Sequence, residues 1–202
     1  MNESTTFPNV AGVVLAGGKS SRMGQDKAFL KRDEQTMLQF TAQQLRLAGV
    51  NDVIVSGSKQ LYSGFDKVVE DTHVELGPLG GMYSVLCQYP EISYLLFIPV
   101  DLPLLSQNGI RPLLLETKHR PDSVMFSGQP LPLMLANTPQ CRSILEKILK
   151  LNERLSIRHF ISKLSVTELQ PDNDDYWFNA NTPQEWQQAI QRLNANVNKD
   201  DS

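Results

Sequence analysis

The sequence contains few of the residues that stabilise a fold through disulfide bonds or bound metals. It contains only two cysteines, Cys87 and Cys141, and three histidines. The cysteines lie far apart without C-x-x-C spacing, so we expect two buried free thiols rather than a disulfide framework or a thiolate metal site. Such cysteine usage suits the reducing cytoplasm. His73, His119 and His159 have no spacing of a catalytic pair or metal cluster, and we expect surface or structural roles for them.

A large positive charge and long apolar runs are also missing, and each absence excludes a class of function. The formal net charge is −3, which argues against general nucleic-acid binding. No apolar run approaches the ~20 residues that span a bilayer, and residues 1–10 lack the basic start and apolar stretch of a secretory signal. We therefore expect a cytoplasmic protein with no nucleic-acid or membrane partner, in which any anion site is local.

The chain has the length of one domain, and its predicted strands and helices alternate as in an α/β fold. Its 202 residues suit one domain of about 150–200 residues, and no internal repeat or linker divides it. Tyr94–Ile98 is continuously apolar, which is typical of a strand covered on both faces of a parallel sheet. We expect one domain over residues 1–202, a three-layer α/β/α sandwich with a mostly parallel sheet. The predicted strands and helices cover Val10–Leu15, Thr36–Leu47, Asp52–Ser56, Lys67–Val69, Leu79–Cys87, Tyr94–Pro99, Ile110–Glu116, Ser123–Phe126, Leu131–Ala136 and Thr138–Leu151.

Two helix starts are marked by a cap residue followed by proline. Thr138-Pro139 opens the helix that runs to Leu151, and Thr182-Pro183 opens the last helix. Asn194–Ser202 is polar and acidic, so we expect it to form a disordered tail.

The segment Leu15–Ala28, LAGGKSSRMGQDKA, is the strongest functional signal. It places three glycines and three basic residues directly behind the apolar run Val10–Val14. Gly17 and Gly18 allow a sharp turn that brings backbone N–H groups close to an anion. The basic side chains would balance the charge of a polyphosphate; they are Lys19, Arg22 and Lys27.

The spacing in this segment fits neither of the two common phosphate loops. A Walker A loop has a lysine after its last glycine, whereas Gln25 follows Gly24 here, and Gly24 comes one position too late after Gly18. A dinucleotide fingerprint needs a second glycine two positions after the first, and Lys19 follows Gly17-Gly18 instead. A solvated basic turn is the alternative, but solubility does not require so many cations and glycines at a strand end.

Asp101 follows the strand predicted over Tyr94–Ile98, between Pro99 and Pro103. Ligands of open parallel sheets bind beyond the carboxyl ends of the strands. A carboxylate there suits Mg²⁺, which usually binds one or two carboxylates plus substrate phosphates. The alternative is a turn aspartate that caps the next segment, but the phosphate loop at the same edge favours a metal–nucleotide site.

Asp71 and the loop Leu76–Gly81 are a third candidate at this edge. The loop carries no charge, and its glycines would let a flat base or ribose lie against the backbone. Taken alone, Gly77-Pro78 is more often a turn leading into a helix.

The segment LAGGKSSRMGQDKA resembles the signature loop of nucleotidyltransferases with a Rossmann-like fold of the nucleotide-diphospho-sugar transferase type, and most closely that of the MobA-like molybdenum cofactor guanylyltransferases. Glu70-Asp71, Leu76–Gly81, Pro99–Pro103 and Phe178–Pro183 extend this resemblance in order over nearly the whole chain. The family implies transfer of GMP from GTP to the phosphate of molybdenum-bound molybdopterin, with Mg²⁺ as cofactor and pyrophosphate as product.

The resemblance also implies roles for individual residues. Lys27 and Asp101 would contact GTP, with Asp101 also binding Mg²⁺. Since charge moves onto pyrophosphate in the implied reaction, we expect Arg22 and Lys27 to neutralise the departing phosphates, so the expected catalytic residues are Arg22, Lys27 and Asp101. Asn179 and Asn181 would lie on the pterin side, although asparagines before a Thr-Pro helix start often serve as caps. The N-terminal half would bind GTP and Mg²⁺ and the C-terminal half the acceptor. The implied nucleotide-binding residues are Leu15, Ala16, Gly17, Gly18, Lys27, Asp71, Gly80 and Asp101.

One departure from the family pattern leaves alternatives open. Many members have an asparagine after the second strand that helps hold the nucleoside, whereas this chain reads Ser56-Gly57-Ser58. The rival readings are transfer from CTP, a sugar-phosphate acceptor, or a non-catalytic carrier of the cofactor. The presence of both Lys27 and Asp101 speaks against a carrier. Delivery of the product implies transient contacts with molybdoenzymes or other cofactor-biosynthesis proteins.

Overall fold

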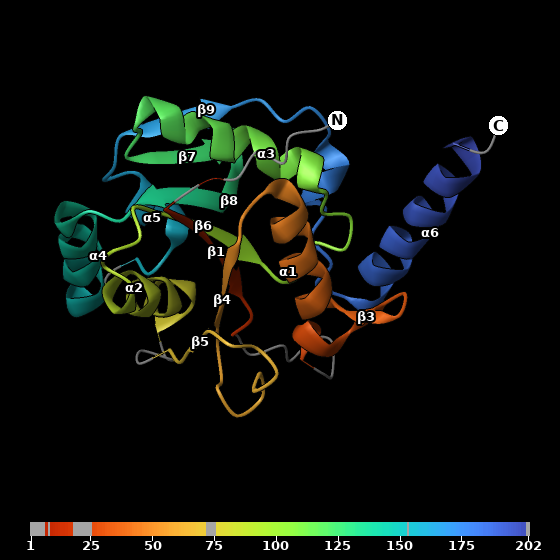
Figure 1. Ribbon diagram of the computed structural model, residues 1–202, viewed down its shortest axis with the longest axis horizontal. Helices are drawn as coiled ribbons and strands as arrows, with labels where there is room; N and C mark the ends of the chain where they lie inside the picture. Colours follow the sequence, from red (N-terminus) through yellow and green to blue (C-terminus); the bar gives the residue numbers. More distant parts are fainter. Residues whose placement is uncertain (1–6, 8, 18–25, 72–75, 153, 201–202) are drawn as a thin grey trace.

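A seven-stranded sheet with helices on both faces organises the chain (Figure 1). The computed structural model describes residues 7, 9–17, 26–71, 76–152 and 154–200, with side chains to 195. The strand order is β5-β4-β1-β6-β8-β7-β9, and β8 alone runs against the others. The strands are β1 Val10–Leu15, β4 Asp52–Ser56, β5 Val68–Val69, β6 Tyr94–Pro99, β7 Ser123–Phe126, β8 Gln129–Ala136 and β9 Val166–Leu169.

The helices form the two outer layers, as the α/β/α prediction requires. Helices α1 and α3 pack on one face of the sheet, where Val14 and Ile98 point, and α2, α4 and α5 pack on the other, with Val13 and Phe97. Each central strand is therefore buried on both faces, which explains its continuous apolar sequence. The helices are α1 Met37–Ala48, α2 Pro78–Gln88, α3 Gln107–Leu115, α4 Pro139–Leu151, α5 Ile157–Ile161 and α6 Pro183–Asp200, with short 3-10 helices η1 Lys27–Phe29, η3 Glu116–His119 and η4 Asp174–Trp177.

The predicted helix starts are confirmed, while some small elements lie outside the prediction. The Thr138 hydroxyl accepts a hydrogen bond from the Cys141 N–H at 3.1 Å, and the Thr182 hydroxyl accepts one from the Glu185 N–H at 3.2 Å. Helix α5 and edge strand β9 are too short to show a clear period. The same holds for the two-stranded hairpin of β2 Lys31–Arg32 and β3 Gln35–Thr36.

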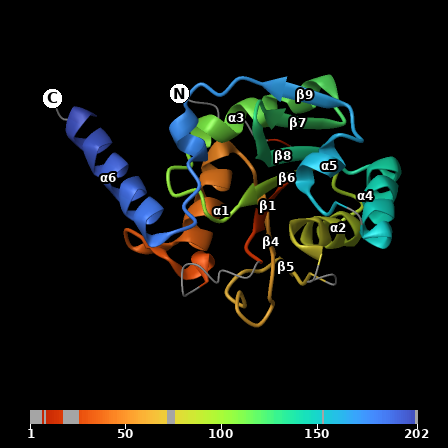
Figure 2. The same ribbon diagram turned by 180° about the vertical axis from the view of Figure 1, so that it is seen from behind.

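The segment Asn194–Ser202, for which we predict a disordered tail, includes the last turns of a helix. Helix α6 continues to Asp200 and extends away from the sheet layers in both views (Figures 1 and 2). Beyond its first residue, Pro183, the sequence of α6 contains no proline or glycine, so nothing in the backbone chemistry ends the helix early. Within the described part of the chain, no helix is both long and apolar enough to cross a bilayer.

The two cysteines are free, but only one of them is buried as predicted. Cys141 lies in the first turn of α4 and is 4% exposed, whereas Cys87 is exposed near the end of α2. Burial raises the pKa of Cys141 to about 11. The thiol of Cys141 therefore stays protonated and shielded near neutral pH.

We expect a thiol-specific reagent at pH 8 to modify one cysteine per native chain and two after unfolding. Cys87 should react first, because it is exposed and the thiolate of Cys141 is disfavoured by burial. The absorbance of the released chromophore measures the count. A native Cys87→Ser variant should be unreactive, and rapid modification of that variant would contradict the assignment.

Candidate active site

The carboxyl ends of four parallel strands meet at one edge of the sheet. Leu15, at the end of β1, is in register with Ser56 of β4 and with Pro99 of β6, and Ser56 is in register with Val69 of β5. The segments that follow these strands therefore leave the sheet side by side. They carry every predicted nucleotide site that the structure describes.

Lys27 connects two of the predicted site residues directly. Its Nζ lies 2.7 Å from Asp101 Oδ2 and donates a hydrogen bond to Asn181 Oδ1 at 2.6 Å. The side chains of Lys27 and Asp101 are 13% and 15% exposed, so this ion pair is largely shielded from water. Residues far apart in the sequence thus form one polar cluster, and solvent screening of their charges is weak.

The second carboxylate oxygen of Asp101 is available for a further ligand. Oδ1 is buried and has no hydrogen-bond partner among the described residues. Buried carboxylate oxygens are normally paired, and an exception indicates an ion or a functional role. The backbone carbonyl of Asp101 accepts a hydrogen bond from the Ala180 N–H at 3.0 Å, which holds the main chain at this position.

Asn179 and Asn181 are fixed by a network at the start of α6. Asn181 Nδ2 donates to Asn179 Oδ1 at 2.6 Å, while Asn181 Oδ1 accepts from Lys27. Hydrogen bonds therefore connect Lys27, Asn181 and Asn179 in a chain. Glu185 accepts hydrogen bonds from the backbone N–H groups of Asn181 and Thr182 at 2.8 and 2.9 Å. These bonds, chiefly the one from Asn181, lower the pKa of Glu185. The network places the two asparagines beside the Lys27–Asp101 pair.

The start of the glycine-rich segment is held by β4. The N–H groups of Ala16 and Gly17 both donate to the carbonyl of Ser56, at 3.0 and 3.1 Å. Leu15 and Ala16 are buried, whereas Gly17 is exposed. The Gly17 N–H, which we predict to face an anion, is instead bonded to the Ser56 carbonyl, so Gly17 offers a ligand its exposed backbone but not this donor.

Asp71 and Gly80 lie farther along the edge. Gly81, next to Gly80, leaves no room for a side chain, since a Cβ there would be 2.6 Å from Ser56 Oγ and 3.9 Å from Asp71 Oδ2. Strands β5 and β6 are three spacings apart in the sheet, or about 14 Å. Asp71 and Asp101 therefore follow strands that are separated by β4 and β1 in the sheet.

Several predicted residues are not placed with the cluster. Gly18, Lys19, Arg22 and His73 lie outside the described residues. His119 is exposed and His159 is partly exposed, as expected for residues without a catalytic role. No group of three or more potential metal ligands occurs in the described part of the chain, so the candidate metal site has few protein ligands.

Two contributors were missed by the sequence reasoning. Glu185 follows Thr182 by three residues, and this T-x-x-E spacing is a recognisable capping signal. Tyr62 is buried beneath the glycine-rich segment, with its hydroxyl 3.0 Å from the Ala16 carbonyl oxygen. A tyrosine in the β4–β5 connection has no motif that would reveal this contact.

Comparisons with known proteins identify the family of the chain. The profile of the MobA-like NTP transferase domain matches residues 12–169. The chain is 37% identical over 183 residues to a molybdenum cofactor guanylyltransferase of Xanthomonas euvesicatoria pv. vesicatoria, covering 89% of this chain and 93% of the relative.

Solved structures share the fold at lower identity. Molybdopterin-guanine dinucleotide biosynthesis protein A from Archaeoglobus fulgidus has a TM-score of 0.75 at 18% identity, covering 92% of this chain and 99% of that one. The manganese complex of Rv0371c from Mycobacterium tuberculosis H37Rv has a TM-score of 0.62 at 18% identity, with coverages of 90% and 98%.

Proposed function

Because the chain belongs to the family of the MobA-like NTP transferase domain, it is a nucleotidyltransferase, and we propose that it transfers GMP from GTP to the phosphate of molybdenum-bound molybdopterin. The named relative at 37% identity supports guanine and molybdopterin as substrates. The observation that carries the proposal is the shielded Lys27–Asp101 pair at the carboxyl edge of the sheet, with one Asp101 oxygen unpartnered among the described residues.

The reaction needs no protein base. A phosphate monoester is already anionic at neutral pH, so the acceptor oxygen can attack the α-phosphate of GTP without losing a proton to a side chain. The obstacle is bringing two anions together while negative charge moves onto the leaving pyrophosphate. The protein contributes positioning and electrostatic stabilisation. This requirement agrees with a polar cluster built on a lysine, a carboxylate and two amides rather than on histidine.

Lys27 is the cation that the described site offers to the nucleotide. Its ammonium group is bound to Asp101 and Asn181 and is poorly exposed, so its charge acts at short range on any phosphate that enters. Arg22, predicted to act with it, lies outside the described residues. We assign Lys27, with Arg22, to the β- and γ-phosphates, whose charge grows as the α–β bond breaks.

We propose Mg²⁺ as the cofactor, held by Asp101. The donor chemistry fits, because Mg²⁺ prefers oxygen ligands and usually takes one or two carboxylates plus substrate phosphates. Asp101 provides the unpartnered oxygen, and no larger ligand cluster occurs among the described residues. A cation held there would supply positive charge against the phosphates of the bound nucleotide. The manganese complex of the Mycobacterium tuberculosis protein supports a divalent cation in proteins of this fold.

The remaining edge residues divide between nucleotide and acceptor. We propose that Leu15, Ala16, Gly17, Gly18, Asp71 and Gly80 contact GTP, which would extend from the Lys27–Asp101 pair toward β5. Asn179 and Asn181 would face molybdopterin from the start of α6. We further propose that the enzyme works in the cytoplasm, where its two free cysteines stay reduced, and that it contacts molybdoenzymes or other cofactor-biosynthesis proteins transiently.

A substrate panel tests the proposal. Purified protein is incubated with Mg²⁺, each nucleoside triphosphate in turn and molybdenum-loaded molybdopterin, and pyrophosphate release and the attached nucleotide are measured. We expect release with GTP and molybdopterin together, and none when the acceptor is omitted. Turnover with CTP, or only with a sugar phosphate, would move the assignment to a related transferase. Binding without pyrophosphate release would indicate a carrier.

A further inference from the structure

The Tyr62 hydroxyl bridges the two ends of the glycine-rich segment. It lies 3.0 Å from the Ala16 carbonyl oxygen and 2.8 Å from Asp26 Oδ2, so one phenolic proton is shared between two acceptors. Ala16 directly follows β1, and Asp26 directly precedes η1. The side chain of Tyr62 is 3% exposed. A single buried group thus joins two positions that are ten apart in the sequence.

The second oxygen of Asp26 connects this bridge to Lys27. Asp26 Oδ1 accepts a hydrogen bond from the Ala28 N–H at 2.9 Å and thereby caps η1, the helix that begins at Lys27. Lys27 in turn reaches Asp101 and Asn181. The Asp26 carboxylate therefore accepts a hydrogen bond from Tyr62 through one oxygen. Through its other oxygen it holds the Ala28 N–H, next to Lys27.

The β4–β5 connection is built to keep Tyr62 in this position. Gly57 is required beneath the ring, since a Cβ there would lie 2.5 Å from Tyr62 Cε2. The Tyr62 N–H donates to the Ser58 carbonyl, and the Phe65 N–H donates to the Tyr62 carbonyl, each at 3.0 Å. The ring of Phe29, in η1, lies 5.8 Å from that of Tyr62.

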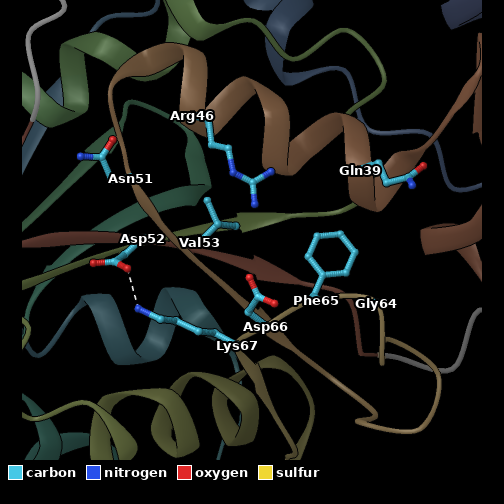
Figure 3. A pocket seen from close by; sticks show the side chains of 9 residues that line it. All are labelled: Gln39, Arg46, Asn51, Asp52, Val53, Gly64, Phe65, Asp66 and Lys67. Carbon is cyan, nitrogen blue, oxygen red and sulfur yellow. Dashed lines mark hydrogen bonds and ion pairs between the residues drawn. The ribbon is translucent and has the colours of Figure 1, made fainter.

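The far end of the connection is anchored against α1 and β4. Figure 3 shows Phe65 and Arg46 facing a cavity of about 330 Å³ between the connection and α1, with Lys67 paired to Asp52 beside it. No residue predicted for the nucleotide site lines this cavity. The Lys67–Asp52 ion pair and the packing of Phe65 against the core hold this end of the connection that carries Tyr62.

We propose that Tyr62 is a positioning residue for nucleotidyl transfer: its shared hydroxyl fixes Ala16 and Asp26 and, through Asp26, places Lys27 against the triphosphate. This inference rests on the proposed function for its reaction. Burial and the hydrogen bond to Asp26 raise the pKa of Tyr62 above the ordinary phenol value. The hydroxyl therefore keeps its proton for the bridge throughout the neutral range.

The test compares Tyr62→Phe, Asp26→Ala and the double variant with wild type. Phenylalanine keeps the packed ring and removes only the hydroxyl, and alanine removes the carboxylate that accepts from Tyr62 and from the Ala28 N–H. We expect each single change to lower kcat/KM for GTP by roughly 10- to 100-fold, as misplacement of a phosphate-binding group does. The double variant should be no worse than the poorer single one, because both remove the same bridge.

Tyr94→Phe is the matched control, since Tyr94 stands at the opposite end of β6 from the site. It should leave kcat/KM unchanged. Hydrogen exchange over residues 26–30 gives a readout independent of activity, and we expect it to accelerate in Tyr62→Phe and not in Tyr94→Phe. Unchanged exchange over 26–30, unchanged kcat/KM with only a lower Tm, or additive losses in the double variant would each overturn the bridge. An inactive wild type with the expected exchange pattern would instead count against the proposed function.

Discussion

Replacing Asp101 with alanine is expected to lower Mg²⁺-dependent turnover by about 10²–10³-fold or more while leaving the fold intact. The substitution removes the buried, unpartnered oxygen assigned to the cation and the ion-pair partner of Lys27. Losing one preorganised electrostatic group at a reacting centre typically costs about 3–4 kcal/mol of transition-state stabilisation. The fold should survive, because the Ala180 N–H bonds to the backbone carbonyl of Asp101, which alanine retains.

Pyrophosphate release across a Mg²⁺ titration measures this effect. Asp172→Asn is the matched control, because Asp172 is exposed. Its substitution removes one negative charge, as Asp101→Ala does, but away from the cluster. The control should titrate like wild type. Circular dichroism and Tm verify that the Asp101→Ala protein is folded. A folded Asp101→Ala enzyme with normal turnover would refute the metal assignment.

Replacing Lys27 with methionine is the second change expected to have a large effect, again about 10²–10³-fold in kcat/KM for GTP. Methionine keeps much of the aliphatic volume and removes the ammonium group that binds Asp101 and Asn181. The substitution therefore removes the positive charge that we assign to the leaving pyrophosphate. Arginine should restore little activity, because its planar fork cannot repeat the two contacts made by one Nζ atom.

Lys31→Met provides the control for charge, since Lys31 is exposed on the nearby β2. It should leave kcat/KM close to the wild-type value. The loss in a Lys27→Met/Asp101→Ala double variant should fall short of the product of the two single losses, because the side chains are in direct contact. Strict multiplication of the losses, or an active Lys27→Met enzyme, would show that the pair does not act as a unit.

The features visible in the sequence are those governed by local rules. Continuous apolar runs predict the central strands because both faces of the sheet are covered, and a carboxylate flanked by prolines after such a run predicts Asp101 at the carboxyl edge. The Thr-Pro helix starts are equally local. Short edge elements such as β9 carry too few residues for a period to be recognised.

The parts of the site that escaped prediction depend on contacts between distant segments. Tyr62 and Asp26 lie 36 positions apart, and their hydrogen bond follows from how the β4–β5 connection folds back onto the end of β1. The Gly17 N–H was expected to face an anion but bonds to the Ser56 carbonyl. Only the register of β1 with β4 reveals that bond. Tertiary geometry therefore decides which backbone donors remain for a ligand.

The polar cluster depends on residues near the end of the chain. Ala180 bonds to Asp101 and Asn181 bonds to Lys27, so the cluster can form only late in synthesis. On a ribosome, β1, β4 and β6 emerge long before residue 181, so a nascent chain can pair these strands while the polar cluster is still open. Release of the last helix-forming segment completes the cluster. A cut in the chain between η4 and α6 would leave Asn181, and with it the hydrogen bond to Lys27, without a covalent connection to the sheet.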